Sequence, residues 1–258
     1  DVGEGESFDA EKAAGDLKRI VAETRRFWGF LPFKRYLILN VFRKGGGGLE
    51  HKDSTLLTSS AARVETPEAY RRWLGFVAHE YFHAFNAKRL RPVELGPFDF
   101  DHPPQTSSLW ITEGLTTYFA DLMVRRAGLS TREDFLERLS GQIRDLQGQA
   151  GRLVQTVEES SLGVWDNSLS GIRPTEKTVS YYVKGDILGF VLDARIRKAT
   201  NGRQSIDDLI RLAYKRYSGE RGFTPAQFQA AASEVAGADL SGWFHLATAS
   251  TEEVDYAE

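Results

Sequence analysis

Residues 77–83 read Val-Ala-His-Glu-Tyr-Phe-His, a stretch in which two histidines four positions apart enclose a glutamate. On an α-helix, positions i and i+4 lie one above the other, so His79 and His83 can reach one ion. Zinc binds neutral imidazole nitrogens at about 2.0–2.1 Å and needs a third protein ligand, which leaves a fourth position for water. Glu80 lies beside that face, where it can take a proton from the water. The stretch therefore predicts a zinc site on a helix.

The expected third ligand is Glu113, which follows His83 by 30 positions within an apolar segment. Leu109 and Trp110 stand at i−4 and i−3, so the glutamate is expected to be buried. A buried carboxylate is costly unless it is paired or bound to a metal. Two alternatives remain open: Glu113 as an exposed helix residue, and the two histidines as half-buried side chains that pack against aromatic neighbours.

These residues together predict the chemistry of peptide-bond hydrolysis. Zinc lowers the pKa of its water and polarises the scissile carbonyl. Glu80 takes the proton of the water and later delivers it to the leaving amine. A hydrogen-bond donor to the tetrahedral oxyanion is then also needed.

Periodicity and capping residues predict an α+β fold. Residues 36–42 and 54–60 are β-prone and are expected to form strands, and the glycine run 45–48 is expected to break regular structure. Ser7 or Asp9 can cap a first helix that ends near Phe27, and Thr66-Pro67 opens the helix of the histidines, which is expected to end near Lys88. Further helices are expected over about 107–126, 131–147, 180–198, 205–217, 225–235 and 240–246, with an ordered loop over 162–178. One catalytic unit is expected, with the N-terminal helix and strands in 1–65 and the helical part with the zinc site in 66–258.

Composition excludes several classes of function. The chain is 41% hydrophobic and 27% charged, as is ordinary for a globular protein, and its longest apolar runs are far too short to span a bilayer. A net charge of −3 gives no overall field for nucleic acid or anionic lipid. The absence of cysteine excludes disulfides, thiolate ligands and cysteine nucleophiles. It does not decide between periplasm and cytosol.

The histidine pair followed by Glu113 resembles the gluzincin metallopeptidases, which have a thermolysin-like catalytic core. Three stretches narrow the resemblance to the glycyl aminopeptidase family, whose members usually carry a PDZ domain. They are the glycine-rich segment Gly46-Gly-Gly-Leu-Glu-His51, the extended zinc motif from His79 to Pro92, and Tyr182-Val-Lys-Gly185 at a helix start. Aminopeptidase N and its relatives share Tyr-x-Lys-Gly and place a comparable glycine-rich strand beside the substrate.

The resemblance implies roles for individual residues. Tyr182 would donate its phenol to the oxyanion, although Tyr181 is easily confused with it and both could be core aromatics. Glu50 would bind the α-ammonium group of the substrate, unless it is merely a loop residue in a flexible tetraglycine turn. Gly47 and Gly48 would let the substrate backbone approach closely.

The sequence departs from the family pattern in two ways. The N-terminal β-domain and the PDZ domain of the family are missing, which is expected of an excised catalytic domain. Thr117 stands four residues beyond Glu113, where some gluzincins have a carboxylate that orients a zinc-bound histidine. The group that holds the imidazole tautomers is left open between Asp121 and a backbone carbonyl.

Three functions follow from these observations. The resemblance implies a zinc aminopeptidase that removes small N-terminal residues, glycine or alanine, from peptides with a free N-terminus. A zinc endopeptidase of the same fold, in which Glu50 is structural, is the first alternative. A non-catalytic peptide-binding module that keeps the zinc helix for stability is the second. Neither nucleic acid nor a membrane span is expected, and the oligomeric state is open.

Overall fold

The computed structural model describes residues 2–3, 8–60, 64–99, 101–166, 171 and 173–256, and these form an α+β arrangement. The chain divides into two compact units, residues 1–88 with 119–136 and residues 89–118 with 137–258. The chain passes from one unit to the other after residues 88, 118 and 136. The second of these points lies inside α3 (Leu115–Arg126) and the third inside α4 (Arg132–Gly148). The units are described in turn.

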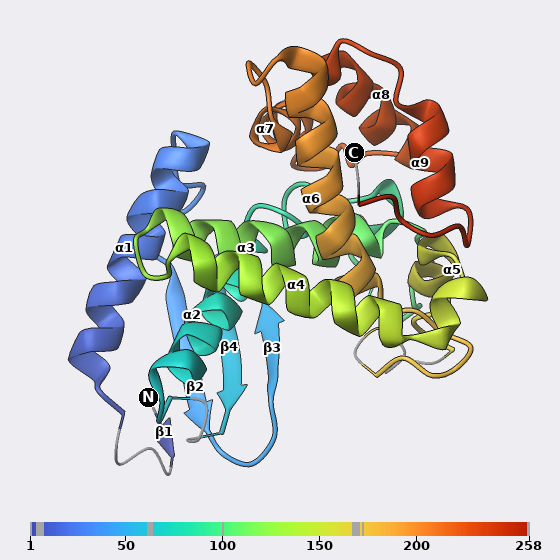
Figure 1. Cartoon of the computed structure of the whole chain (residues 1–258). Coiled ribbons are helices and arrows are strands. Elements are labelled where there is room, and N and C mark those ends of the chain that lie inside the picture. The colour runs from blue at the N-terminus through green and yellow to red at the C-terminus, as the bar shows by residue number, and fades with distance from the viewer. Residues whose placement is uncertain are drawn as a thin grey trace. The chain divides into compact units, whose positions relative to one another are not determined.

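The first unit contains a small sheet with the strand order β1-β2-β4-β3, drawn in blue in Figure 1. Strands β1, β2 and β4 run parallel, and β3 runs antiparallel to β4 at the edge. The elements wholly in this unit are β1 (Val2–Gly3), α1 (Ala10–Trp28), β2 (Leu37–Phe42), β3 (Gly47–Glu50), β4 (Ser54–Ser59) and α2 (Pro67–Phe82).

Local signals begin both helices where the sequence predicts. The side chain of Asp9 accepts a hydrogen bond from the backbone N–H of Lys12 at 2.9 Å and so caps α1. Gly29 ends α1 in the left-handed conformation that glycine adopts without steric cost. Thr66 caps α2 in the same way as Asp9, with proline at the first turn. Ser7, the other predicted cap, lies outside the described residues.

Apolar side chains pack the two helices onto one face of the sheet. Ile20 of α1, Leu57 of β4 and Trp73 of α2 are at most 2% exposed and belong to one cluster. Burial of each such side chain contributes roughly 1.5–3 kcal/mol. On the other face, Leu39 and Leu49 both pair with Leu56 of β4, and all three are exposed. Among the described residues, these side chains therefore pack one face of the sheet and leave Leu39, Leu49 and Leu56 exposed on the other.

Two boundaries in this unit differ from the sequence prediction. The glycine run does not end regular structure, because Gly47 and Gly48 begin β3 and pair with Thr58 and Leu57. Cross-strand hydrogen bonds to β4 compensate there for the low strand propensity of glycine. The histidine helix ends at Phe82 rather than near Lys88, and Ala87 adopts a positive φ of 99°.

The second unit is helical in the part of the chain that the structure describes. Its longest helix is α6 (Tyr181–Thr200), capped by the side chain of Ser180 and ended by Asn201 in the left-handed conformation. The other elements wholly in this unit are η2 (Val93–Leu95), η3 (Trp110–Gly114), η4 (Ala150–Leu153), α5 (Val157–Leu162), α7 (Ile206–Tyr217), α8 (Pro225–Ala236) and α9 (Ser241–Thr248).

Most of these helices agree with the sequence prediction within a few residues, with two exceptions. The predicted helix over 107–126 is interrupted, because η3 is a π-helical turn that precedes α3. Helix α5, which Thr156 caps together with Glu159, was not predicted. Residues 167–170 and 172 of the predicted loop 162–178 lie outside the described residues.

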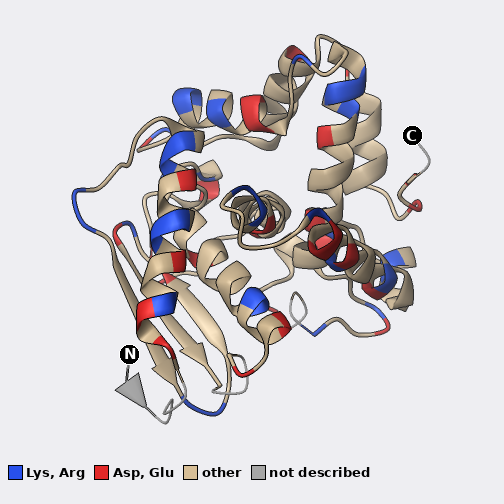
Figure 2. Ribbon diagram, turned by 60° about the vertical axis from the view of Figure 1, so that its left-hand side comes forward, with Lys and Arg blue, Asp and Glu red and all other residues tan. Residues whose placement is uncertain are grey.

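Charged residues of both signs are interspersed along the helices (Figure 2). This distribution agrees with the small net charge of −3. Among the described residues, no helix is both long and apolar enough to cross a membrane.

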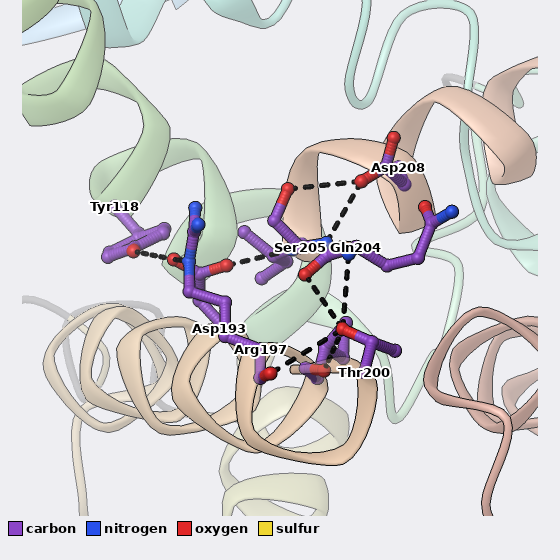
Figure 3. A network of polar contacts seen from close by, with 9 residues as sticks. Tyr118, Asp193, Arg197, Thr200, Gln204, Ser205 and Asp208 are labelled. Atoms are coloured by element: carbon purple, nitrogen blue, oxygen red, sulfur yellow. Dashed lines mark hydrogen bonds and ion pairs between the residues drawn. The ribbon is translucent and has the colours of Figure 1, made fainter. Parts of the chain in front are cut away.

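A buried carboxylate joins three helices of the second unit (Figure 3). Asp193 of α6 accepts hydrogen bonds at Oδ2 from the hydroxyl of Tyr118 at 3.2 Å and from Nε of Arg197 at 2.9 Å. Its Oδ1 accepts from the backbone N–H of Ile206, the first residue of α7, at 2.9 Å. Burial, followed by the charge and hydrogen bond of Asp193, raises the pKa of Tyr118 well above its ordinary value. Tyr118 therefore remains a donor at any physiological pH.

We predict that Asp193→Asn destabilises the protein by about 1–3 kcal/mol, because a neutral amide cannot accept from all three donors and leaves one of them buried and unsatisfied. The measurement is urea unfolding followed by circular dichroism. Asp145→Asn, on the exposed side of α4, is the matched control and should change stability by less than about 0.5 kcal/mol. Equal effects of the two substitutions would contradict this role of Asp193.

Candidate active site

Helix α2 brings the two predicted histidine ligands together. The Nε2 atoms of His79 and His83 lie 2.9 Å apart, with His83 buried and His79 half-buried. Two imidazoles on one tetrahedral zinc would hold these atoms about 3.3 Å apart, given zinc–nitrogen bonds of about 2.0–2.1 Å. The pair therefore has nearly the separation that a shared ion requires.

A backbone carbonyl orients the ring of His83. Its Nδ1 lies 3.0 Å from the carbonyl oxygen of Asn86, so Nδ1 carries the proton and Nε2 keeps its lone pair for a metal. Of the two groups left open by the sequence, the backbone carbonyl is thus the partner of His83. Asp121 lies beside α2 one turn before His79, with Oδ1 3.3 Å from where a side chain at Gly75 would begin. Asp121 stays the candidate partner for His79.

Aromatic packing fixes the end of α2 where the histidines lie. The ring of Phe82 stacks on Phe119 of α3 with centroids 5.1 Å apart, and the ring of Phe85 stacks on Trp28 of α1 at 4.9 Å. Such pairs contribute about 0.5–1.5 kcal/mol each beyond the burial of their surface. The helix end is therefore held by rigid groups.

The predicted base faces the edge strand of the sheet. Glu80 is 6% exposed, and a side chain at Gly48 of β3 would overlap its carboxylate. Only glycine at position 48 lets the backbone of β3 lie this close to the carboxylate of Glu80. Gly47, with a φ of 155°, is exposed at the start of the strand. Glu50 ends β3 and is half-buried, with Oε1 2.8 Å from Nζ of Lys88.

Glu113 lies in the π-helical turn of the second unit. The N–H of Leu115 donates to the carbonyl of Trp110, five residues back, which is the hydrogen bond that defines this turn. Glu113 is half-buried, whereas the sequence analysis expected a buried side chain. That expectation assumed regular helical spacing from Leu109 and Trp110, and the extra residue in the turn changes the face on which Glu113 lies. Thr117 donates to the backbone carbonyl of Glu113 at 2.9 Å.

Two glycines bring η3 and α6 into backbone contact. A Cβ atom at Gly185 would lie 2.7 Å from the carbonyl oxygen of Trp110 and 2.8 Å from Cα of Gly114. The first turn of α6, with both candidate tyrosines, therefore packs directly beside the turn of Glu113. The sequence motif at 182–185 contains Gly185, but no sequence pattern predicts its contact with Gly114, the residue directly after Glu113.

The two tyrosines differ in environment. Tyr181 is 4% exposed, and burial, with a smaller effect from the charge of Glu113, raises its pKa to about 12. Tyr182 is half-buried and stacks on Tyr181 with ring centroids 4.8 Å apart. The Tyr181 phenol therefore remains a protonated donor at neutral pH. Tyr182 is the one with surface open to solvent.

Among the described residues, His79, His83 and Glu113 are a group that could hold a metal ion, with possible ligand atoms within 4.8 Å of one another. Two imidazole nitrogens and a carboxylate oxygen are a donor set that zinc accepts, with a fourth position left for water or substrate. The residues present therefore fit the metal that the sequence predicts.

Part of the chain that contains the candidate site is similar to known proteins. The family model of M61 glycyl aminopeptidase matches residues 72–188, which include the three candidate ligands, Glu80 and Tyr182, but not Glu50. A crystal structure of an aminopeptidase N family protein from Idiomarina loihiensis superimposes with a TM-score of 0.90 at 26% identity. The match covers 96% of this chain and 44% of that protein, so this chain spans less than half of its length. A search of curated protein sequences found no match.

We predict that Gly185→Ala destabilises the second unit by about 1–3 kcal/mol, because its methyl group meets backbone atoms of η3 that cannot move aside singly. The measurement is the free energy of unfolding in urea. Gly242→Ala in α9 is the matched control, because nothing lies within 4 Å of its Cβ position. This control should be neutral or stabilising by up to about 1 kcal/mol, as expected of alanine in a helix. A stability of Gly185→Ala at or above wild type would refute the close contact.

Proposed function

The chain is related to the M61 glycyl aminopeptidases through residues 72–188, and we propose that it is a zinc-dependent aminopeptidase. Its substrates are peptides with a free N-terminus and a small first residue, glycine or alanine. The observation that carries the proposal is the group of His79, His83 and Glu113, which lies within the matched segment and has the donor atoms of a catalytic zinc site. The likeness to the aminopeptidase N family protein supports a thermolysin-like gluzincin core.

In this proposal, His79, His83 and Glu113 hold the zinc ion. When bound, zinc supplies a Lewis acid that polarises the scissile carbonyl and acidifies the attacking water. The hydrogen bond from Nδ1 of His83 to Asn86 keeps its Nε2 available as a ligand.

The proton transfers fall to Glu80. Its carboxylate accepts a proton from the attacking water and returns it to the amine as the peptide bond breaks. Its burial beside Gly48 excludes bulk water that would otherwise solvate the carboxylate. Tyr182 donates its phenolic hydrogen to the oxyanion that develops on the carbonyl oxygen. Its half-buried position, against the 4% exposure of Tyr181, supports this assignment over Tyr181.

Strand β3 supplies the substrate-binding residues. Its described partner in the sheet is β4, which leaves the outer edge to an extended peptide. Gly47 and Gly48 let that peptide approach, and Glu50 receives its α-ammonium group. If Glu50 were only structural, the same machinery would act as an endopeptidase. A non-catalytic peptide-binding module is less well supported, because Glu80 and Tyr182 are both retained.

We predict that the zinc-loaded protein hydrolyses glycyl peptides and loses at least about 100-fold in kcat/KM when the substrate amine is acetylated, because the charge that pairs with Glu50 is removed. The measurement is product release from each peptide by liquid chromatography. Comparable rates on free and acetylated peptides would establish the endopeptidase instead.

We also predict that Glu80→Gln lowers kcat by about 10²–10⁴-fold while zinc stays bound, because the amide can neither accept nor return the proton. Zinc content is measured by elemental analysis on the same preparation that is assayed. Glu11→Gln, at an exposed position of α1, is the control and should keep wild-type activity. Unchanged hydrolysis by Glu80→Gln would refute the base, and loss of zinc would assign Glu80 a role in metal binding.

A further inference from the structure

Glu50 is not a free carboxylate at the edge of the sheet, because Lys88 is paired with it. Nζ of Lys88 lies 2.8 Å from Oε1 of Glu50, and the side chains are only 19% and 21% exposed. Opposite charges at this distance and degree of burial interact more strongly than an exposed pair does. The ion pair between Lys88 and Glu50 is therefore part of the packed structure of the first unit.

The position of Glu50 on β3 directs its side chain toward the catalytic helix. Side chains two residues apart on a strand point to the same face, and Gly48 faces the carboxylate of Glu80. Glu50 therefore projects on the side of Glu80, about 7 Å further along the strand. If the amine of a peptide binds Glu50, its first peptide bond can therefore lie near Glu80.

Lys88 reaches Glu50 from the turn that follows the histidines. The N–H of Lys88 donates to the carbonyl of His83 at 3.1 Å, and the left-handed Ala87 directs the chain back at this point. The backbone of Lys88 is thus hydrogen-bonded to His83, a candidate metal ligand, and its ammonium group is paired with Glu50, the candidate substrate-binding residue.

We propose that Lys88 is a positioning residue that orients the carboxylate of Glu50 for the α-ammonium group of the substrate, an inference that rests on the proposed aminopeptidase function. A carboxylate offers about four acceptor sites on its two oxygens. Lys88 occupies one site at Oε1, and the substrate ammonium takes a site on the other oxygen. Lys88 therefore stays in place when substrate binds, and the distance between the amine and the scissile bond is set by a fixed carboxylate.

The test compares Lys88→Met with wild type, both loaded with zinc, on a free glycyl peptide and its N-acetylated counterpart. Methionine keeps most of the length and apolar stem and removes the charge. We expect KM for the free peptide to rise about tenfold with kcat changed less than about twofold, as for a lost binding contact. Lys88→Arg should restore most of the affinity, and Lys44→Met, at an exposed loop position, should behave as wild type. Lys88→Gln replaces Lys88→Met if the latter does not fold.

A second comparison tests whether Lys88 acts through Glu50. Glu50→Gln alone should raise KM, and adding Lys88→Met to it should raise KM no further, because the group being oriented is already lost. Additive effects of the two substitutions would overturn the inference.

The other outcomes separate the inference from the proposed function. If wild type requires a free amine but Lys88→Met has an unchanged KM, or only a lower kcat, the positioning role is wrong and the aminopeptidase stands. A lower KM would show that Lys88 competes with the substrate ammonium, which also overturns the role. If wild type cleaves both peptides equally, the aminopeptidase proposal fails and the role of Lys88 fails with it.

Discussion

The hydrogen bond between Nδ1 of His83 and the carbonyl oxygen of Asn86 constrains the region around the C-terminal end of α2. It can form only if the chain turns sharply after Phe82, so the helix must end there. The same turn carries Phe85 onto Trp28 and Lys88 toward Glu50. A single tautomer of one ring, a stacked aromatic pair and an ion pair thus depend on one short reversal of the backbone. This dependence links the proposed metal site to the local fold more closely than the histidine spacing alone does.

Missing side chains give the proposed site much of its geometry. At Gly48 the absence of a Cβ atom makes room for the carboxylate of Glu80, and at Gly114 and Gly185 it lets two helical turns meet backbone to backbone. In each case a methyl group would collide with a residue assigned to the chemistry or with its immediate neighbour. Close packing of this kind fixes positions to a fraction of an ångström, because a dense interior cannot adjust gradually. Precise placement is what proton transfer and oxyanion binding require.

The sequence predicts features that are determined by residues close together in the chain. It misses features that are determined by contacts between distant residues. The i, i+4 histidines, the caps at Asp9 and Thr66 and the strand ending at Phe42 all follow from local pattern. Strand β3 was missed because its glycines have low strand propensity, and only pairing with β4 makes them extended. The pairing of Lys88 with Glu50 and the contact of Gly114 with Gly185 join residues far apart in the chain and leave no local pattern. The grouping of the three candidate ligands was therefore predictable, whereas contacts between distant segments around them were not.

The π-helical turn at Trp110–Gly114 also affects how this segment can be compared with others. Such a turn accommodates one residue more than an α-helix does, and each residue of an α-helix advances by about 100°. Leu109, the helical residue before the turn, is therefore out of phase with the apolar residues of α3 after it. An alignment that treats residues 107–126 as one regular helix will place Glu113 one position away from its structural equivalent in a relative without the turn. In evolutionary terms, a single inserted or deleted codon at this point would redirect the carboxylate.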